Sequence, residues 1–522
     1  MRSVMQHAFS QIPSADIPRS SFDRTHGYKT TFDAGYLVPV YVDEALPGDT
    51  FNLSLTAFAR LATPIYPIMD NLFMDTFFFF VPYRLLWSNF QKMMGEQVNP
   101  GDSTDYLVPK ITSPAGGYSE STLQDYFGLP TKVAGYDHSA LPLRAYNLIW
   151  NEWFRDENFQ SSLVKNMGDG PDTPTDYVLK RRGKRHDYFT SALPWPQKGS
   201  AVSLPLGLSA PVSVSAASVT GVNPAVRISD GTYHAIRTST TPPVDNTLNS
   251  ANNATSTNYL FADLSSATAA TINQLRQAFA IQRLYERDAR GGSRYTEIIR
   301  SHFGVVSPDQ RLQRPEYLGG GSTPININPV AQTSATASQP SPQGNLAAFG
   351  TVSVHNHGFT KSFTEHGVII GLVNVRADLT YQQGLNRMWS RRTRFDHYWP
   401  AFSHLGEQTI LNKEIYCQGT AGGAADGQVF GYQEAWAEYR YKPSLITGLF
   451  RSNASLSLHA WHLSINFGSL PALNASFIEE NPPLDRVVAV PSQPDILYDS
   501  FIKLRCVRPM PVYSVPGMID HF

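Results

Sequence analysis

DTFFFFVP, at residues 75–82, is the stretch from which the fold class can be argued. In an extended strand the side chains alternate, with Phe77 and Phe79 on one side and Phe78 and Phe80 on the other. A strand that is apolar on both faces has to be covered on both faces. In a sandwich, one face meets the opposite sheet, and the second face needs an arm, a long loop or a neighbouring subunit. Each aromatic ring can bury about 150–250 Å², so leaving the second face in water would be costly.

Other segments alternate between apolar and polar residues, as half-buried strands do. FNLSLTAFAR, at 51–60, places Phe51, Leu53 and Leu55 on one face and polar residues on the other. Further strands are predicted in the C-terminal third, at 367–381, 455–467 and 499–510. The sum is an all-β protein with a β-sandwich core interrupted by long loops, which is how a jelly roll with enlarged loops would look.

Helices are expected only in the long connections. LPLRAYNLIWNEWFRDENFQ, at 141–160, has a helical period with aromatic residues on one face. A capping-box pattern opens a second helix at 271–291, which a glycine pair ends, and a third helix is predicted at 294–303. The Pro/Ser/Thr-rich stretch from 319 to 345 is expected to be an extended loop.

Composition divides the chain into three parts. Residues 1–40 are predicted to be an extended N-terminal arm, because their prolines break any helix. Residues 200–270 are rich in Ser, Thr, Ala, Asn and Val and poor in charge, which is typical of a surface insertion. Residues 41–200 and 271–522 then form a jelly-roll domain that is discontinuous in the sequence.

The composition favours a protein that assembles. Charged residues make up 16% of the 522 residues, against roughly 25% in ordinary soluble proteins, and aromatic residues make up 12%. Tyr, Phe and Trp are enriched in interface cores, although a monomer with an aromatic core would share this composition. The formal net charge of −1 argues against a chain that coats nucleic acid over its whole surface. Contact with a genome then needs a local patch or a separate basic partner.

The sequence contains no sign of export or membrane insertion. Residues 1–13 lack a charged segment followed by an apolar one, and no stretch approaches about 18 consecutive apolar residues. The two cysteines, Cys417 and Cys506, have no metal-ligand spacing and suit a reducing compartment. We therefore expect synthesis and assembly in the cytoplasm, without membrane insertion.

No catalytic or cofactor motif is found. The phosphate-binding glycine loops, G-x-S-x-G and H-E-x-x-H are all absent from the sequence, so neither catalytic residues nor cofactors are predicted. His355 and His357, with His366 nearby, could ligate a metal, but no fourth ligand has the expected spacing, and an ordinary loop role is favoured. Glu479 and Glu480 are a carboxylate pair, but neighbours on an extended chain point apart, which favours a solvated turn.

Two basic runs are the candidate nucleic-acid contacts. The first, at 180–185, is followed closely by Tyr188 and Phe189, and the second, within 387–394, surrounds Trp389. Arginine interleaved with aromatic residues suits single-stranded nucleic acid, through phosphate pairing and base stacking. The alternative is an inter-subunit patch of salt bridges and cation–π contacts. The predicted nucleic-acid-binding residues are Lys180, Arg181, Arg182, Lys184, Arg185, Arg391, Arg392 and Arg394.

Four long segments are chemically specific. They are FDRTHGYKTTFDAGYLVPVYVDEALPGDTF (22–51), LPLRAYNLIWNEWFRDENFQ (141–160), KRRGKRHDYFTSALPWPQKG (180–199) and LRQAFAIQRLYERDARGGSRYTEIIRSHFGV (275–305). These segments resemble the major capsid protein of the Microviridae, in particular the gokushovirus branch. The segment at 416–451 is similar as well, and the resemblance covers essentially the full length except around 205–265.

The resemblance implies a single eight-stranded antiparallel jelly roll of the viral capsid type, with long insertions that carry a few helices. Identical subunits would build a small icosahedral shell, with a scaffolding protein, around a circular single-stranded DNA genome. A small, very basic internal protein would neutralise the DNA, which fits the net charge of −1. The insertion at 200–270 would form a protrusion at the three-fold axes and contact a host receptor. The protein would then be located in the virion.

Two other classes of protein remain open from the residues alone. A secreted β-rich carbohydrate-active enzyme should have a signal peptide and a cleft with paired carboxylates. A trimeric receptor-binding adhesin should show repeats or a fibrous region. None of these features is seen in the sequence, so the prediction is a shell protein without enzymatic activity.

Overall fold

The computed structural model describes most of the chain. The described residues are 18–200, 202, 212–214, 225–227, 233–236, 248–250, 260–262, 272–292, 294–304, 313–334 and 343–513. The chain forms two compact units, one made of Met1–Pro196 with Gly292–Phe522 and the other of Gln197–Gly291.

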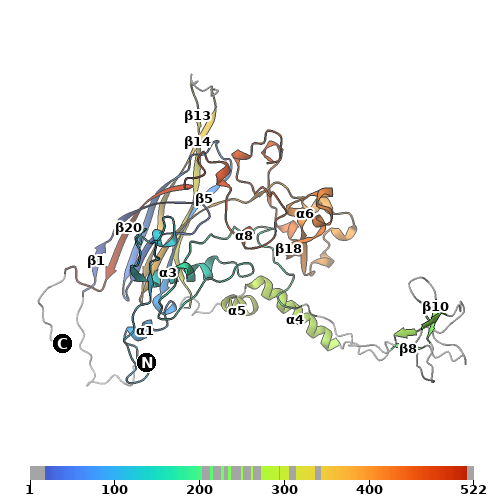
Figure 1. The fold of residues 1–522 in the computed structure, drawn as a ribbon, viewed down its shortest axis with the longest axis horizontal. Coiled ribbons are helices and arrows are strands. Elements are labelled where there is room, and N and C mark those ends of the chain that lie inside the picture. Colours follow the sequence, from blue (N-terminus) through green and yellow to red (C-terminus); the bar gives the residue numbers. More distant parts are fainter. Residues whose placement is uncertain are drawn as a thin grey trace. The chain divides into compact units, whose positions relative to one another are not determined.

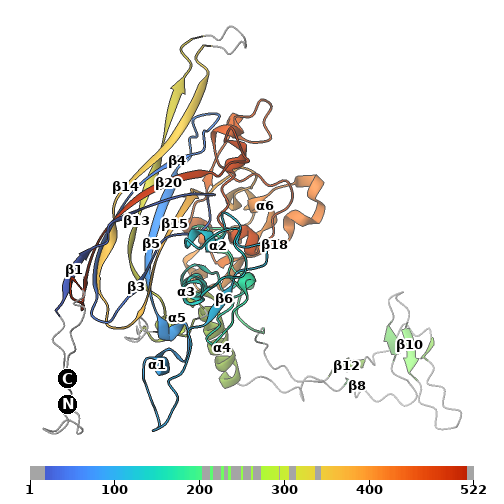
Figure 2. The ribbon, with the colours of Figure 1, turned by 60° about the vertical axis from the view of Figure 1, so that its left-hand side comes forward.

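One curled antiparallel sheet dominates the first unit (Figures 1 and 2). Its order is β1–β20–β4–β14–β13–β5–β15–β3, and β2 also pairs with β20. The strands are β1 (Ser20–Asp23), β2 (His26–Phe32), β3 (Val38–Ala45), β4 (Thr50–Leu61), β5 (Leu72–Pro82), β13 (Glu316–Ala331), β14 (Leu346–Ser362), β15 (Gly367–Ala377) and β20 (Ile496–Arg508). The all-β prediction is therefore confirmed.

The strand order is that of a jelly roll. One half of the sheet holds β2, β20, β4 and β14, and the other holds β3, β15, β5 and β13. The first four long strands of the chain alternate between the halves, as jelly-roll strands do. Strand β13 joins the halves, because residues 316–325 pair with β5 and residues 326–331 pair with β14. The sheet has nine strands where eight were expected, since β1 and β2 pair with successive segments of β20.

Strand β5 is covered on both faces, as its sequence requires. Phe78 and Phe80 lie between the two halves of the sheet, where their ring centroids are 5.5 Å from Phe359 and 4.6 Å from Phe363. Phe79, on the opposite face, is only 1% exposed. It belongs to a cluster formed with the chain's own insertion after β5, including Trp87, Tyr146 and Trp150. The cover is therefore a long loop of the same chain, one of the three alternatives that the sequence left open.

Short elements organise this insertion and the C-terminal connections. In the insertion they are α1 (Phe90–Met93), β6 (Lys110–Thr112), α2 (Leu123–Tyr126), β7 (Asp137–Ser139) and α3 (Leu141–Ile149), which continues into a π-helical turn (Trp150–Phe154). Nearer the C-terminus they are β16 (Thr380–Tyr381), β17 (Glu407–Leu411), α6 (Asn412–Ile415), β18 (Val429–Glu434), α7 (Ala437–Arg440), β19 (Ser444–Leu445) and α8 (Ala475–Ile478). The helix predicted at 141–160 is thus shorter than expected.

The prediction of a loop at 319–345 is wrong for residues 319–331, which belong to β13, and residues 335–342 lie outside the described residues. The Pro, Ser and Thr content of the stretch suggested a loop, but its three glycines permit close backbone approach within the sheet. A Cβ atom on Gly320 would collide with the carbonyl oxygen of Thr76 on β5, and the φ of Gly320 is +152°. Figures 1 and 2 show β13 and β14 extending beyond the other strands as a long hairpin.

The strand predicted at 455–467 is also wrong. Leu463 is 2% exposed, but its backbone N–H donates to the side chain of Asp70 instead of a neighbouring strand. The carbonyl groups of His462 and Ser464 accept hydrogen bonds from Arg486, at 2.7 and 2.8 Å. Side chains satisfy this backbone, so the alternation of buried residues does not indicate sheet pairing. The strands predicted at 51–60, 367–381 and 499–510 are confirmed as β4, β15 and β20.

The second unit holds the insertion predicted at 200–270, most of which lies outside the described residues. Its described elements are β8 (Val212–Val214), β9 (Ala225–Arg227), β10 (Tyr233–Ile236), β11 (Leu248–Ser250), β12 (Leu260–Ala262) and α4 (Ile272–Gly291). In the first unit, α5 (Tyr295–Phe303) ends at Gly304, whose φ is +69°. The helices predicted at 271–291 and 294–303 are therefore confirmed to within a residue.

Because β5 is buried on both faces, the substitution Phe79→Ala should strongly destabilise the protein. Truncating a buried phenylalanine costs about 3–5 kcal/mol, from lost burial and the cavity left behind. Urea denaturation of the unassembled protein should show this loss as a lower midpoint at an unchanged slope. Phe395→Ala is the matched control, because Phe395 is 70% exposed. Equal effects of the two substitutions would contradict the packing described for β5.

Candidate functional site

The first basic run, 180–185, is built into the fold. The guanidinium of Arg181 lies 4.1 Å from the ring centroid of Tyr36 and donates to the carbonyl oxygen of Glu480 at 3.0 Å. The ammonium of Lys180 lies 5.8 Å from the ring centroid of Trp150. The contacts of Arg181 attach the end of the insertion to the segment before β3 and to the segment that contains Glu480.

Arg182 and Arg376 share the carboxylate of Asp75, the first residue of the two-faced stretch on β5. The Arg376 Nε lies 2.8 Å from Asp75 Oδ2, and Asp75 is 4% exposed. Burial acts to raise the pKa of Asp75, but hydrogen bonds from Ser322 and Arg182 outweigh it and hold the pKa below its ordinary value. Asp75 therefore remains ionised between two guanidinium groups.

Lys184 is also turned into the protein. Its ammonium donates to the carbonyl oxygen of Phe477, and burial lowers its pKa. Nearby Glu480 is 2% exposed, and burial raises its pKa. The solvated turn predicted at Glu479 and Glu480 is wrong for Glu480, whose side chain accepts from the backbone N–H of Ala377 at 3.3 Å.

Arg185 is the member of the first run with an exposed side chain. The side chain is 60% exposed, and its guanidinium lies 3.7 Å from the carboxylate of Asp378. An exposed pair at this distance contributes little to stability. Arg185 is therefore available to a partner, whereas Arg182 and Lys184 already serve the fold.

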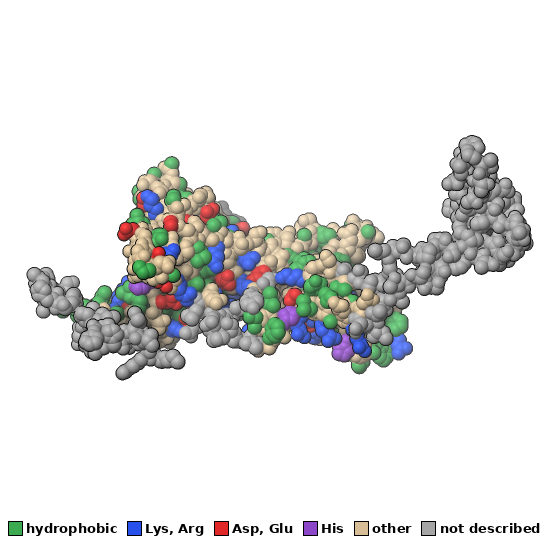
Figure 3. Space-filling model, turned by 90° about the horizontal axis from the view of Figure 1, so that it is seen from below, with side chains coloured by type: hydrophobic (Ala, Val, Ile, Leu, Met, Phe, Trp, Pro, Cys, Tyr) green, Lys and Arg blue, Asp and Glu red, His purple; other side chains and the backbone are tan. Residues whose placement is uncertain are grey.

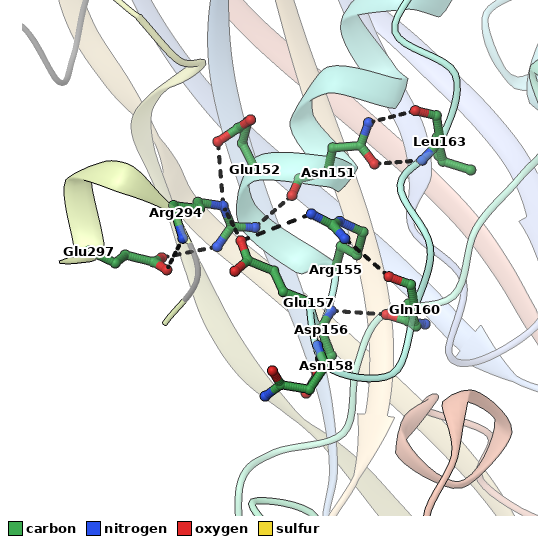
Figure 4. A network of polar contacts seen from close by, with 10 residues as sticks. All are labelled: Asn151, Glu152, Arg155, Asp156, Glu157, Asn158, Gln160, Leu163, Arg294 and Glu297. Carbon is green, nitrogen blue, oxygen red and sulfur yellow. Dashed lines mark hydrogen bonds and ion pairs between the residues drawn. The ribbon is translucent and has the colours of Figure 1, made fainter. Parts of the chain in front are cut away.

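Sequence reasoning missed a polar network at Arg294, which Figure 4 shows. The Arg294 Nε lies 2.9 Å from a carboxylate oxygen of Glu157 and 3.4 Å from one of Glu152. A second nitrogen pairs with Glu297 at 3.0 Å, and a third donates to the carbonyl oxygen of Asn151. The three glutamates neutralise Arg294, so this cluster holds α5 against the π-helical turn. In the sequence, the i, i+3 spacing of Arg294 and Glu297 was the one indication of this polar network.

The second basic run differs, because two of its members remain exposed. Arg391 pairs with Glu438 at 2.9 Å and lies 4.3 Å from the ring centroid of Tyr439. Arg392 is exposed, and Arg394 is exposed with its guanidinium 4.7 Å from the ring centroid of Trp399. Arg392 and Arg394 are thus exposed beside aromatic residues, whereas the members of the first run other than Arg185 contact the fold.

A large apolar surface surrounds the second run, and we call it the aromatic surface. Its members are large hydrophobic side chains that are between 42% and 71% exposed. They are Met388, Trp389, Phe395, Tyr398, Trp399, Leu405, Tyr439, Tyr441, Leu445 and Leu449. Phe395 and Leu405 line one pocket of this region, and Trp389, Tyr441 and Leu445 line another. Large exposed apolar patches mark interaction sites.

The three histidines considered as metal ligands have other contacts. The ring of His357 is hydrogen-bonded to Thr76 at 2.8 Å and Thr323 at 3.2 Å, and burial lowers its pKa. His355 contacts Ser353, and the ring of His366 packs 5.8 Å from that of Phe90. Within the described ranges, no group of three His, Cys, Asp or Glu residues is placed to hold a metal ion.

On the face shown in Figure 3, basic and acidic side chains lie interspersed with hydrophobic ones. Cys417 is exposed and Cys506 is buried, and both are free thiols. Among the helices that the structure describes, none has the length and hydropathy that a membrane span requires.

Comparison with known proteins identifies the family. A family model described as "Capsid protein (F protein)" matches residues 10–518. The chain belongs to this capsid protein family. The capsid protein VP1 of Bdellovibrio phage phiMH2K is 50% identical over 537 residues, covering 99% of this chain and 98% of the relative. VP1 of Chlamydia phage 1 is 48% identical over 586 residues, covering 99% and 98%.

A third relative, VP1 of Spiroplasma virus 4, is 38% identical over 541 residues, covering 98% of this chain and 97% of the relative. All three come from gokushoviruses of the Microviridae, so the predicted resemblance is confirmed. The chain is a structural capsid protein of the virion and not an enzyme. The match leaves no support for a secreted carbohydrate-active enzyme or a receptor-binding adhesin. In a capsid protein, a large exposed apolar surface is the feature that needs a partner.

Because most of the first run is built into the fold, removing a buried charge and removing an exposed charge should change the stability of the capsid protein by different amounts. Asp75→Asn leaves Arg182 and Arg376 without their carboxylate and should cost about 3–5 kcal/mol. Arg185→Gln, at a side chain 60% exposed, should change stability by less than about 1 kcal/mol. Because the pKa of Asp75 is depressed in the folded protein, its contribution is lost as the pH falls through that pKa.

The Asn variant should therefore lose less additional stability on acidification than the unmodified protein. Urea titrations of both variants at neutral and acid pH provide the measurement. Equal destabilisation by the two substitutions would show that Asp75 does not hold the first run to β5.

Proposed function

We propose that the chain is the major capsid protein that self-assembles into a closed icosahedral shell around a circular single-stranded DNA genome. The aromatic surface is the observation that carries the proposal. It contains Trp, Tyr and Met and surrounds the arginines of the second run, and these residue types are enriched at the cores of protein interfaces. With its ten members about half exposed, the surface could bury on the order of 1,000 Å², about what a specific interface needs.

Closed symmetry strengthens this arrangement. In a ring or shell of identical subunits each copy takes part in several contacts, so each contact can be modest. The arginines of the surface support such a role, because Arg391 already pairs with Glu438 and stacks on Tyr439 in the single chain. A guanidinium held against a ring is preorganised for a partner, which reduces the entropy lost on contact.

Contact with the genome would then be shared among partners. The net charge of −1 supports a small basic internal protein that neutralises the DNA. A scaffolding protein would assist assembly in the host cytoplasm. The eight basic residues of the two runs stay proposed nucleic-acid contacts, and exposure favours Arg185, Arg392 and Arg394 among them.

The insertion at 200–270 is proposed to form a three-fold protrusion that contacts a host receptor. It lies within the second compact unit, Gln197–Gly291, which supports a part of the chain that is separate from the jelly roll. Residues 1–40 are proposed to act as an arm, although their described portion also supplies β1, β2 and the start of β3.

The shell proposal predicts closed particles when the chain is expressed with its assembly partners. Trp389→Ser combined with Leu445→Ser should abolish particles while leaving the subunit folded, because both side chains are at least 60% exposed and only a partner buries them. Val98→Ser with Leu107→Ser is the control, at side chains 81% and 87% exposed outside the aromatic surface.

Electron microscopy of negatively stained particles and circular dichroism of the subunits give the two readouts. A wild-type protein that yields only monomers or trimers would contradict the shell proposal. Normal particles from the Trp389 and Leu445 variant would show that the aromatic surface is not the contact.

A further inference from the structure

The outer face of β4 and β20 carries an unusual set of exposed side chains. Along both strands one set of side chains is buried between the halves of the sheet, and the other set faces outward. We call the outward set the β4–β20 face. It comprises Asn52, Ser54, Thr56, Phe58 and Arg60 of β4, and Leu497, Asp499, Phe501, Lys503 and Arg505 of β20.

Three large apolar side chains lie in a line across this face. Leu497, Phe58 and Phe501 are 51%, 50% and 56% exposed. Phe58 is paired in register with Asp499, so Leu497 and Phe501 are its diagonal neighbours, roughly 7–8 Å away. In Figure 2, β1, β20 and β4 form the left-hand flank of the sheet, whereas α2 and α3 lie on its other side. Within the described part of the chain, the insertion that covers β5 does not cover this face.

Basic side chains border the apolar line at both ends. Arg60 is the cross-strand neighbour of Leu497, and Lys503 and Arg505 follow Phe501 along β20. In the part of the chain that the structure describes, none of these three pairs with a carboxylate within 4 Å. Lys29 of β2 adds a fourth cation, whose ammonium lies 3.6 Å from Asp499 in an exposed pair.

The opposing negative charges are fewer. Asp23, in register with Arg505, and Asp499 are the carboxylates beside these four cations. The face therefore carries an excess of positive charge in a chain whose net charge is −1. The remaining positions are Ser, Thr and Asn, which can hydrogen-bond to phosphate or sugar.

We propose that the β4–β20 face is a stacking platform for single-stranded DNA, with bases on Phe58 and Phe501 and phosphates at Arg60, Lys503 and Arg505. This inference rests on the proposed function, which supplies the DNA, and it implies that this face lines the inside of the shell. Exposed aromatic rings on a sheet flanked by cations bind single strands, because every base has a face to stack and every linkage has a charge to pair. A second copy of the chain fits the face less well, since like charges would meet.

The experiment measures the binding of oligothymidylate to the full-length, unassembled protein at several salt concentrations. Replacing Arg60, Lys503 and Arg505 by glutamine removes three phosphate partners, and each contributes about 0.7 to the slope of log K against log salt. The slope should therefore become shallower by about 2. Replacing Phe58 and Phe501 by serine should weaken binding about fivefold to a hundredfold per ring with the slope unchanged.

The matched control replaces Lys110, Lys132 and Lys165 by glutamine, which makes the same change in charge at exposed side chains of the insertion. It should leave affinity and slope as in the wild type. Platform variants that bind like the control would overturn the inference. So would platform variants that are folded but form no particles, because the face would then be a contact between copies.

A second measurement uses wild-type particles and does not depend on how the variants fold. Particles grown with bromodeoxyuridine are irradiated, and the cross-linked peptides are located by mass spectrometry. Cross-links on β4 and β20 peptides support the platform, and cross-links confined to other peptides contradict it. A wild-type chain that forms no DNA-filled particles would instead contradict the proposed function itself, so the two failures are distinguishable.

Discussion

Strand β5 carries large apolar side chains on both faces, and neither face tolerates water. One face is buried between the halves of the sheet against Phe359 and Phe363. The other requires a cover, which the insertion after β5 supplies through Trp87, Tyr146 and Trp150. Asp75, at the start of the same stretch, then binds Arg182 and Arg376 and so attaches the end of the insertion. The jelly roll and the insertion that follows β5 in the first unit thus form one packed body, which gives a shell subunit a rigid wall.

How far the sequence predicts this arrangement depends on the range of the interactions. Alternation is local, so the two faces of residues 75–82 and the buried set of β4 follow from the sequence. The roles of the basic residues depend on partners far along the chain. Arg182 meets Asp75 across 107 positions, and Arg181 meets the Glu480 carbonyl across 299. Arginine next to aromatic residues gives the same sequence pattern whether it binds DNA or stabilises the fold. Only its contacts in the structure distinguish the two roles.

Other differences have equally physical causes. The Pro, Ser and Thr residues of 319–345 suggested a loop, but Gly320 allows β13 to approach Thr76 closely within the sheet. The alternation at 455–467 suggested a strand, but the side chains of Asp70 and Arg486 satisfy that backbone. The β4–β20 face left local signals in the sequence, because Phe58 interrupts the polar side of β4 and Phe501 interrupts the polar side of β20. An exposed aromatic residue on the polar side of a strand is the sequence feature to look for in such a face.

Two surfaces of the subunit are proposed to have different roles in the shell. The aromatic surface offers apolar area for protein contacts, and the β4–β20 face offers cations and rings for a single strand. Electron cryomicroscopy of the assembled particle tests this division most directly. The account predicts that Trp389 and its neighbours are buried between adjacent copies, with Phe58 and Phe501 facing the lumen. A reconstruction in which the aromatic surface is open to solvent and the β4–β20 face lies on the outside would contradict it.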